Sequence, residues 1–371
     1  MTFHKVTKMR VGVLSKVPKL FDQVQQKCSQ RASIAALIED GRLVLNNYKD
    51  DSSLASLDLN EIMLADPKLI ADRIDNCLPR LQWMQATYAG VNVIVDTTQR
   101  TNYVLTRIGS GFGPQMANYC FSWILHFQQE VRTSLEQQKN KDWNQEQYFK
   151  RVDLEGKRVA ILGAGAIGSA VAHTAAAFGM KCLGLRSSGS IVKSNSDQDY
   201  LSSIAPFERM TSSIEEALSY GDYIINCLPS TPSTRCLLTS GLLKDAYESR
   251  VKSATDTDNT PSAPMLINIG RGDFTSADTI LAALEKGHIS LAVLDVCEEE
   301  PLCPNSPLWT HPRVVITPHI SAISTANLTS DIFVDNLERF ISAAFPITDI
   351  PVPTHELANK LKYSVNRDKG Y

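Results

Sequence analysis

The sequence predicts an α/β fold of two domains, in which the larger domain is built on a parallel sheet that helices cover on both faces. From Val152 onward, short apolar runs alternate with helical patterns. These runs are apolar at every position, which is typical of strands buried on both faces and therefore of a parallel sheet between two helical layers. The length of 371 residues also exceeds what one typical hydrophobic core organises.

Six apolar runs in the second part of the chain are predicted to be strands. A helix is expected after the first of them, from Ile167 to Phe178, because this stretch is rich in alanine and ends at Gly179. The segment Ser212–Glu216 offers a capping box for a further helix before the third strand. The predicted strands are Arg158–Leu162, Lys181–Leu185, Tyr223–Leu228, Met265–Ile269, Leu291–Val296 and Val314–Thr317.

The first part of the chain, to about Phe112, has a βα pattern of its own, with strands expected at Met9–Leu14 and Leu81–Thr87. Large apolar residues then recur every three or four positions from Met116 to Leu135, which predicts one long amphipathic helix crossing into the next domain. A second long helix, about 325–344, would carry the chain back. We therefore expect residues 1–112 and 322–371 to form a smaller, flavodoxin-like α/β substrate domain. The dinucleotide-binding domain, 113–321, would be inserted into it, with a cleft between the two.

Composition limits the classes of function. A net charge of −3, without a basic block, argues against nucleic-acid binding. The apolar runs are too short to span a membrane, and the apolar run near the start is too short for a secretory signal. None of the eight cysteines form a C-x-x-C pair, which favours reduced thiols in a cytoplasmic protein. A mitochondrial presequence at the mildly basic start stays open.

A glycine-rich turn indicates a dinucleotide site. Gly163, Gly165 and Gly168 form a G-x-G-x-x-G motif that follows a predicted strand and opens a helix, the context of a Rossmann βαβ unit. In that unit the first glycine permits the turn, the second admits the pyrophosphate and the third lets helix and strand pack closely. Backbone amides at the helix start, around Ala166 and Ile167, would face the phosphates. A glycine-rich turn without a ligand is the alternative.

The end of the second predicted strand bears on the choice of cofactor. An NAD-binding Rossmann unit usually has a carboxylate about twenty residues after the motif. This chain has Arg186, Ser187 and Ser188 there, and a guanidinium with two hydroxyl groups suits a 2′-phosphate. The sequence therefore favours NADP(H). NAD(H) stays possible, with Arg186 facing solvent.

Three charged residues follow the last predicted strands in the order Arg271, Glu300 and His319. Hydride transfer to a 2-keto acid needs a cation for the carboxylate and an acid that protonates the developing alkoxide. The planar fork of Arg271 suits the first task and the imidazole of His319 the second, while Glu300 would favour the charged ring. Parallel strands end at one edge of the sheet, so we expect these groups to meet there.

Each of these residues also has an ordinary structural interpretation. Arg271 could hold a sheet edge, His319 could cap or pack, and Glu300 belongs to a run of three glutamates that could be solvated. A metal site is a further alternative, but its candidate ligands lack close spacing, so no metal is expected. Those candidates are Asp295, Glu300, His311 and His319.

At this point the chain resembles the D-isomer-specific 2-hydroxyacid dehydrogenase family. Ile267–Asp273 resembles the segment that carries the substrate arginine, and Thr317–Ser321 resembles the segment of the catalytic histidine. Leu294–Leu302 resembles the segment of the catalytic glutamate and selects Glu300 from its neighbours. The region around 106–119 is more similar to the glyoxylate/hydroxypyruvate reductase branch, whose members include NADPH users.

The resemblance implies further contacts. The cofactor would meet the loop after the third predicted strand, at Leu228, Pro229 and Thr234. Asp295 and the backbone of Ile269 would hold the nicotinamide carboxamide. A loop in the first domain would bind the substrate carboxylate through backbone amides, at Tyr88, Ala89 and Gly90. The family also implies a homodimer formed through the long helix near residue 116.

The predicted function is NADPH-dependent reduction of a small 2-keto acid, such as glyoxylate or hydroxypyruvate, to the D-2-hydroxy acid. Two alternatives stay open, an NAD-dependent dehydrogenase for a bulkier 2-hydroxy acid and a nucleotide-sensing module similar to a corepressor. Departures from the family pattern at Asn92, Asn118 and Cys297 bear on substrate choice, because they leave the three charged residues intact.

Overall fold

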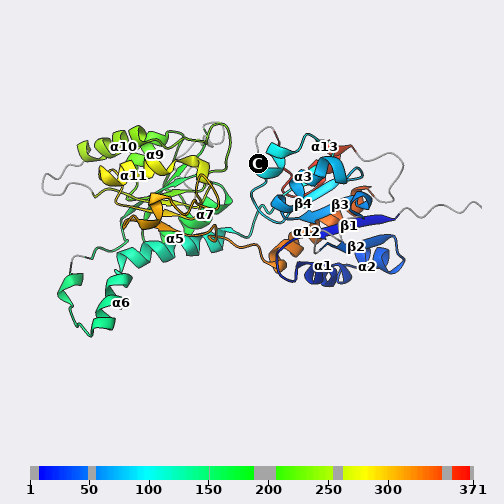
Figure 1. The fold of residues 1–371 in the computed structure, drawn as a ribbon, viewed down its shortest axis with the longest axis horizontal. Helices are drawn as coiled ribbons and strands as arrows, with labels where there is room; N and C mark the ends of the chain where they lie inside the picture. The colour runs from blue at the N-terminus through cyan, green and yellow to red at the C-terminus, as the bar shows by residue number, and fades with distance from the viewer. Residues whose placement is uncertain are drawn as a thin grey trace, which may run out of the picture. The chain divides into compact units, whose positions relative to one another are not determined.

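The computed structural model describes residues 8–48, 56–149, 151–187, 206–253, 262–344 and 353–367. The chain divides into two compact units. The first, here the N/C unit, comprises Met1–Gly111 and Ser324–Tyr371, and the second, here the central unit, comprises Phe112–Ile323. Each unit has its own parallel sheet with helices on both faces (Figure 1), so the predicted α/β fold class is confirmed.

The described part of the central unit contains a seven-stranded sheet in the order β12-β11-β10-β9-β6-β7-β8, with every neighbouring pair parallel. All six predicted strands are present, although four end one or two residues earlier than expected. The edge strand β8 was missed because its three residues, Arg-Met-Thr, form no apolar run. The strands are β6 (Arg158–Leu162), β7 (Lys181–Leu185), β8 (Arg209–Thr211), β9 (Tyr223–Asn226), β10 (Met265–Asn268), β11 (Leu291–Leu294) and β12 (Val314–Ile316).

Helices cover this sheet in two layers, with α9, α10 and α11 on one face and α5 and α7 on the other (Figure 1). Ser213 caps α9 by accepting a hydrogen bond from the backbone of Glu216, as the capping-box pattern predicted. The glutamate side chain bonds Thr211 in place of the cap residue. The helices are α5 (Gly113–Gln128), α6 (Val131–Asn140), α7 (Ala166–Ala177), α9 (Ile214–Tyr220), α10 (Ser240–Lys252) and α11 (Ala277–Glu285), with short 3-10 helices η2 (Glu146–Tyr148), η4 (Gly272–Phe274) and η5 (Pro307–Thr310).

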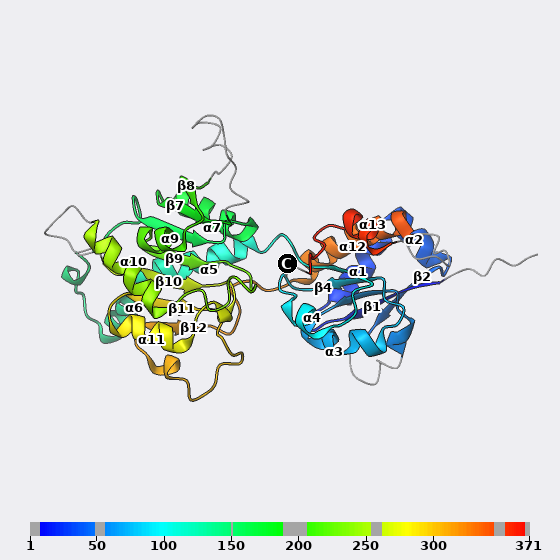
Figure 2. The same ribbon diagram turned by 90° about the horizontal axis from the view of Figure 1, so that it is seen from above.

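The N/C unit contains a five-stranded parallel sheet in the order β2-β1-β3-β4-β5, the strand order of flavodoxin-like folds. Figure 2 shows α12 and α13 on one side of this sheet and α3 and α4 on the other. The elements are β1 (Met9–Leu14), α1 (Leu20–Ser29), α2 (Ala32–Glu39), β2 (Leu43–Asn47), β3 (Ile62–Ala65), α3 (Pro67–Cys77), β4 (Trp83–Ala86), α4 (Asn92–Thr97), β5 (Val104–Thr106), α12 (Ala326–Ala344) and α13 (Thr354–Lys360).

Trp83 on β4 fixes the returning helix α12 to the sheet of the N/C unit. Its ring stacks on Phe333 and Phe340, with centroids 5.2 and 5.7 Å away. Its indole N–H donates to Thr106 Oγ1 at 2.8 Å, so the polar edge of this fully buried ring is satisfied. Both segments of the N/C unit, far apart in the sequence, thus share one core.

The prediction of a single long helix from Met116 to Leu135 is wrong. The chain forms α5 and α6, and Glu130 between them adopts a left-handed conformation with φ 49°. The carbonyl of Gln129 accepts a hydrogen bond from the guanidinium of Arg151 instead of continuing the helix. No described residue of α6 is buried, so the apolar spacing that continued to Leu135 does not mark a core face. Moreover, α5 begins after the boundary between the units and does not cross it.

All eight cysteines lie among the described residues, and each is a free thiol there. Within the same described ranges, no helix has the length and apolar character to cross a membrane.

Candidate active site

The predicted site residues of the central unit follow the carboxyl ends of parallel strands. Because neighbouring strands are parallel, the loops that leave β6, β7, β9, β10, β11 and β12 share one edge of the sheet. Open α/β sheets bind ligands at this edge, where the order of connection reverses, here between β6 and β9. The structure therefore places the glycine turn and the three charged residues along one edge.

The glycine turn has the geometry that a pyrophosphate requires. Gly163 adopts φ +103°, and its position leaves little room, because a Cβ there would lie 3.1 Å from the backbone of Cys227. Gly168 lets α7 approach β6, since a Cβ there would lie 2.2 Å from the carbonyl oxygen of Gly163. By contrast, a Cβ on Gly165 would meet no heavy atom within 4 Å, and this residue precedes the first helical amides. The turn thus offers open space at the helix N-terminus, which fits a phosphate group.

Gly168 and Gly165 give a matched pair of variants. Gly168→Ala is expected to lower the free energy of unfolding by about 1–3 kcal/mol, because the added methyl group collides with backbone. Gly165→Ala is expected to unfold like the parent protein, since φ −91° suits alanine, while dinucleotide affinity falls about tenfold or more. Urea unfolding and fluorescence titration with NADPH separate the two effects. Equal loss of stability in both variants would contradict this assignment.

Arg186 and Ser187 directly follow β7 and are exposed at the same sheet edge. The backbone N–H of Arg186 donates to Thr211 O on β8 at 2.9 Å, which fixes the start of this loop. Ser188 lies outside the described residues. Arg186, which is predicted to recognise the ribose end of the cofactor, therefore has its backbone fixed at the end of β7.

Two buried asparagines, which the sequence analysis missed, brace the loops after β9 and β10. Asn226 donates through its amide to Asn268 Oδ1 at 2.9 Å, and it accepts from the backbone N–H of Leu228 at 3.1 Å. Asn268 donates to Arg271 O at 3.1 Å. The signal in the sequence is a polar residue that closes an otherwise apolar strand. These bonds position the backbone of Leu228 and Arg271, two of the predicted site residues.

Arg271 leaves β10 next to the segment that carries Glu300. Its Nη1 donates to Gly270 O at 2.7 Å, which directs the guanidinium along its own turn. A Cβ on the following residue, Gly272, would lie 1.8 Å from Cys297 O, so the two chain segments are in direct backbone contact. The arginine turn and the glutamate segment are therefore neighbours in space.

Glu300 and His319 form a hydrogen-bonded pair. His319 Nδ1 lies 3.0 Å from Glu300 Oε2, and the backbone N–H of Cys297 donates to Glu300 Oε1 at 3.3 Å. The side chain of His319 is 51% exposed and that of Glu300 is 30% exposed, so the pair is accessible to a small ligand. With Nδ1 engaged by the carboxylate, Nε2 is the ring nitrogen that can carry a transferred proton.

His319 has a backbone conformation that L-residues rarely adopt, with φ 56°, and Asp295 holds it there. The backbone N–H of His319 donates to Asp295 O at 2.9 Å. The Asp295 carboxylate, 1% exposed, accepts from the backbone N–H groups of Ile320 and Ser321, both at 2.8 Å. Such bonds offset the cost of a left-handed residue. Asp295 was predicted to contact the cofactor, and its oxygens also organise the histidine loop.

A hydroxyl group on α5 extends this network. Thr317 Oγ1 donates to Asp295 Oδ1 at 2.6 Å, and Tyr119 Oη lies 2.6 Å from Thr317 Oγ1. Because the threonine proton goes to the carboxylate, the tyrosine is the donor in the second bond. Burial raises the pKa of Tyr119 well above its ordinary value, so this phenol stays protonated. The sequence did not reveal the roles of Tyr119 and Thr317, because α5 and the histidine loop are almost 200 positions apart.

In the N/C unit, Tyr88, Ala89 and Gly90 form the loop after β4. The buried Thr87, immediately before them, donates through Oγ1 to Asp66 Oδ1 at 2.6 Å. Asp66 also accepts from the backbone N–H of Lys16 at 2.8 Å, so one carboxylate ties the ends of three strands. Tyr88 is 40% exposed, and burial together with the Asp66 charge raises its pKa. This loop has the anchored backbone expected of a carboxylate-binding turn.

The metal-site alternative concerned Asp295, Glu300, His311 and His319. Across the described ranges, no group of three or more His, Cys, Asp or Glu side chains is arranged to hold a metal ion. The carboxylates of Asp295 and Glu300 are instead engaged with the histidine loop and the histidine ring.

The fold and the site together define a dinucleotide-binding oxidoreductase. The family model of the D-isomer specific 2-hydroxyacid dehydrogenase NAD-binding domain matches residues 121–321, more than half of the chain. The chain therefore belongs to the D-isomer specific 2-hydroxyacid dehydrogenase family, whose members are NAD(P)-dependent oxidoreductases.

Solved structures of similar proteins cover the whole fold. A D-isomer specific 2-hydroxyacid dehydrogenase family protein from Aeromonas salmonicida is 28% identical, with a TM-score of 0.74 over 98% of this chain and 100% of that one. An NADPH-dependent glyoxylate/hydroxypyruvate reductase from Sinorhizobium meliloti, in complex with NADP and sulfate, is 23% identical with a TM-score of 0.72 over the same shares. A D-isomer specific 2-hydroxyacid dehydrogenase from Xanthobacter autotrophicus, in complex with NADPH, is 21% identical with a TM-score of 0.73, again over 98% and 100%.

Proposed function

We propose that this protein reduces a small 2-keto acid, of the size of glyoxylate or hydroxypyruvate, to the D-2-hydroxy acid with NADPH. The observation that carries the proposal is the pairing of His319 with Glu300 at 3.0 Å, on the sheet edge that also bears the open glycine turn. A proton donor and a dinucleotide turn on one edge are what carbonyl reduction needs.

Each charged residue has a distinct role in this proposal. When bound, the nicotinamide supplies a hydride to the carbonyl carbon. Arg271 binds the substrate carboxylate and polarises the carbonyl oxygen through its planar fork. His319 gives the proton on Nε2 to that oxygen, and Glu300 stabilises the charged imidazole that carries this proton. The amides of Tyr88, Ala89 and Gly90 would hold the carboxylate from the N/C unit.

The cofactor contacts proposed for this chain extend along the sheet edge. The loop after β9 would meet the dinucleotide at Leu228, Pro229 and Thr234, and its shape is fixed because Thr234 Oγ1 accepts from Thr231 N at 2.8 Å. Ile269 and Asp295 would hold the carboxamide. The S. meliloti and X. autotrophicus structures contain NADP and NADPH, which agrees with the charge of Arg186 in favouring the phosphorylated dinucleotide.

Arg186→Asp is expected to reverse the cofactor preference. The aspartate would repel a 2′-phosphate and accept from a ribose hydroxyl, so the KM for NADPH should rise about 30-fold or more, equivalent to about 2 kcal/mol. Activity with NADH should persist or increase. Initial rates with both dinucleotides measure the change, and Arg209→Asp, on the neighbouring strand β8, is the charge control. An unaltered KM ratio would remove Arg186 from cofactor selection.

The activity is tested with purified protein, NADPH and a panel of 2-keto acids of increasing size, by the loss of absorbance of the reduced nicotinamide. We expect turnover of glyoxylate and hydroxypyruvate. Turnover restricted to bulkier keto acids with NADH would support the alternative dehydrogenase. Binding of peptides that responds to dinucleotide, without turnover of any acid at saturating cofactor, would overturn the enzymatic proposal.

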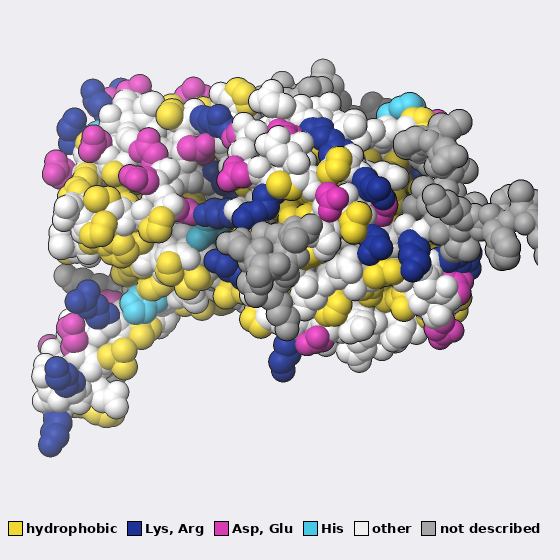
Figure 3. All heavy atoms as spheres, turned by 45° about the vertical axis from the view of Figure 1, so that its right-hand side comes forward, with side chains coloured by type: hydrophobic (Ala, Val, Ile, Leu, Met, Phe, Trp, Pro, Cys, Tyr) yellow, Lys and Arg dark blue, Asp and Glu magenta, His cyan; other side chains and the backbone are white. Residues whose placement is uncertain are grey.

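We also propose a homodimer that forms through residues 131–149 and 151–152 of the central unit, here called the arm. The arm carries large apolar side chains in contact with solvent: Val131 (37% exposed), Leu135 (59%), Trp143 (97%), Phe149 (71%) and Val152 (55%). In Figure 3 it stands out as a separate lobe on which hydrophobic side chains alternate with Lys and Arg. Several large apolar side chains exposed within one segment are typical of an interface. All eight cysteines are free thiols, which agrees with a reducing compartment. We therefore propose that the protein is located in the cytoplasm.

Trp143→Asp is expected to weaken this dimer. Large aromatic side chains contribute most at interfaces, so the dissociation constant should rise about 30-fold or more. Light scattering after size exclusion reports the mass at several concentrations. Val251→Asp, an exposed apolar position on α10 outside the arm, should keep the parent mass. A parent protein that is monomeric at every concentration would contradict the proposed dimer.

A further inference from the structure

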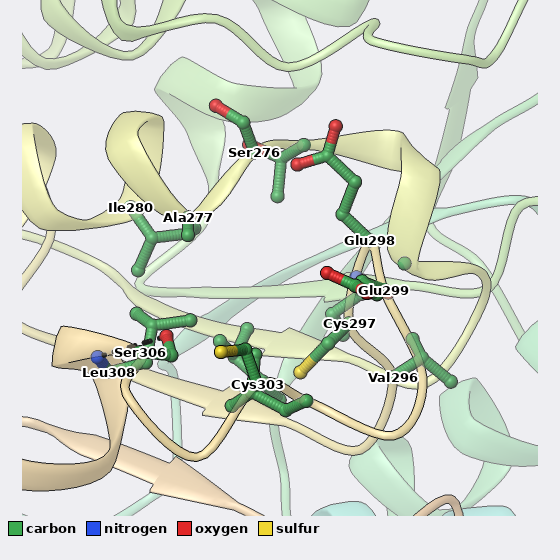
Figure 4. A pocket seen from close by; sticks show the side chains of 15 residues that line it. Ser276, Ala277, Ile280, Val296, Cys297, Glu298, Glu299, Cys303, Ser306 and Leu308 are labelled. Atoms are coloured by element: carbon green, nitrogen blue, oxygen red, sulfur yellow. Dashed lines mark hydrogen bonds between the residues drawn. The ribbon is translucent and has the colours of Figure 1, made fainter.

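A small pocket lies next to the segment that carries Glu300. It has a volume of about 170 Å³ and is enclosed by the start of α11 and by the segment that joins β11 to η5. Ser276, Ala277 and Ile280 line one side, and Val296, Cys297 and Cys303 line the other (Figure 4). The side chains of Arg271 and His319 do not line it. The pocket is therefore separate from the groups proposed to bind substrate.

Two thiols share this pocket. In Figure 4 the sulfur atoms of Cys297 and Cys303 point into the same space. Both cysteines are free, Cys303 is exposed and Cys297 is partly buried. Residues 296–302 form neither helix nor strand, and in the described structure their backbone makes no hydrogen bond to other backbone groups. The two ends of the segment are held, because Asp295 N donates to Asn268 O at 3.0 Å and Cys303 O accepts from Ser306 N at 2.9 Å. The backbone between the two thiols can therefore rearrange without breaking a ladder or helical hydrogen bond.

The same segment carries the carboxylate of Glu300, which is proposed to position His319. Glu300 lies between the two cysteines in the sequence, and its Oε1 accepts the hydrogen bond from the backbone N–H of Cys297 at 3.3 Å. Its Oε2 pairs with His319 Nδ1 at 3.0 Å. A covalent change at Cys297 therefore acts on a contact that orients this carboxylate.

We propose that Cys297 and Cys303 are a redox-active dithiol that a small hydroperoxide converts to a disulfide. In the first step the thiolate sulfur of one cysteine attacks a peroxide oxygen, the O–O bond breaks, and a sulfenic acid and an alcohol or water form. In the second step the other thiolate attacks the sulfenic sulfur, the S–O bond breaks and the oxygen leaves as water. Two thiols lose two electrons, and the peroxide gains them.

The surroundings of the thiols set the order of these steps. Burial, together with the carboxylates of Glu300 and Asp295, raises the pKa of Cys297 to about 11, so this residue is almost entirely protonated near neutral pH. Cys303 is exposed and is the thiol that peroxide reaches first. Cys297 then attacks the sulfenic sulfur through its small thiolate fraction. The acid–base equilibrium of the Cys297 thiol replaces this thiolate as it is consumed.

The consequence for turnover rests on the proposed function. A disulfide requires the two Cα atoms to come within about 7 Å of each other, which closes a short ring that contains Glu300. Closing this ring shifts the N–H of Cys297 away from Glu300 Oε1 and loosens the pairing with His319. We expect kcat to fall at least about tenfold in the oxidised protein, because proton donation depends on that pairing. A thiol reductant should restore it.

The chemical test is made on the full-length protein by peptide mass. Trypsin releases Gly287–Arg313, which contains these two cysteines and no other. After hydrogen peroxide, this peptide should lose the mass of two hydrogen atoms, and dithiothreitol should reverse the loss. Cys303→Ser should abolish the change, whereas Cys77→Ser, an exposed cysteine in the N/C unit, should not affect it. A peptide that keeps its mass, or only gains oxygen, would overturn the dithiol.

A second measurement tests the link to Glu300. Turnover of the oxidised parent protein is compared with that of Cys303→Ser treated in the same way, before and after reductant. Reversible loss in the parent protein alone is expected. Full turnover in a protein whose peptide shows the disulfide would overturn the link to Glu300 but leave the dithiol standing. If the untreated protein reduces no keto acid, the proposed function fails, while the peptide mass still decides whether the disulfide forms.

Discussion

Replacing His319 with Asn is expected to lower kcat for 2-keto acid reduction by about 10²–10⁴-fold, the usual contribution of a general acid. Asn is the informative substitution because it tolerates the left-handed conformation that His319 adopts, with φ 56°. The loop held by Asp295 should therefore keep its shape. The amide of Asn cannot donate a proton to the alkoxide, so the loss reports on chemistry and not on folding.

The measurement is steady-state kinetics at saturating NADPH and keto acid, accompanied by thermal unfolding. Dinucleotide affinity should stay within about twofold of the parent value, because the glycine turn lies on another strand of the sheet. Glu300→Gln is the matched variant, since it keeps the acceptor for the Cys297 N–H and removes the charge that stabilises the imidazolium. It should lose less activity than His319→Asn. A His319→Asn protein with the parent kcat would exclude this residue as the proton donor.

The parts of the site that the sequence predicted are those that local pattern determines. Strand positions follow from continuous apolar runs, and the positions of Arg271, Glu300 and His319 follow from the ends of those runs. Because β10, β11 and β12 pair in parallel, all three residues lie on one edge of the sheet. This placement does not depend on the side chains within the strands. This is why apolar runs and motif spacing were enough for the fold class and for the positions of six strands of the central unit.

The residues that hold the site in shape could not be predicted in the same way. Asp295 supports the histidine loop through bonds to residues more than twenty positions away, and Tyr119 reaches Thr317 from α5. Such contacts depend on tertiary packing, and a single buried aspartate does not show its partners in the sequence. Asn226 and Asn268 were detectable in principle, because each is a buried polar residue at the end of an otherwise apolar strand.

The broken helix shows the limit of periodicity. Apolar residues at three- and four-residue spacing continued through Val131 and Leu135, and they indicated one helix with one buried face. In the structure both side chains are exposed on α6, and Glu130 turns the chain between the two helices. Periodicity reports that a face is apolar but not what covers it. An apolar face that a partner covers gives the same spacing as one that a core covers.

Replacing Arg271 with Ala is expected to lower kcat/KM for the keto acid by about 10²–10³-fold, equivalent to about 2.7–4 kcal/mol, within the range for losing one partner of a hydrogen-bonded charge pair. The loss should appear in both constants. KM should rise because the substrate carboxylate loses its cation, and kcat should fall because the carbonyl loses its polarising group.

Arg271→Lys separates charge from geometry in this experiment. Lysine keeps the positive charge but has no planar fork, so it can hold the carboxylate without bridging to the carbonyl oxygen. We expect it to recover much of the KM of the parent protein and little of its kcat. Both variants lose the guanidinium that donates from Nη1 to Gly270 O, so thermal unfolding of each is compared with the parent protein to detect a disturbed turn. Recovery of kcat by lysine would show that charge alone suffices, and an Ala variant with parent kinetics would place the substrate carboxylate elsewhere.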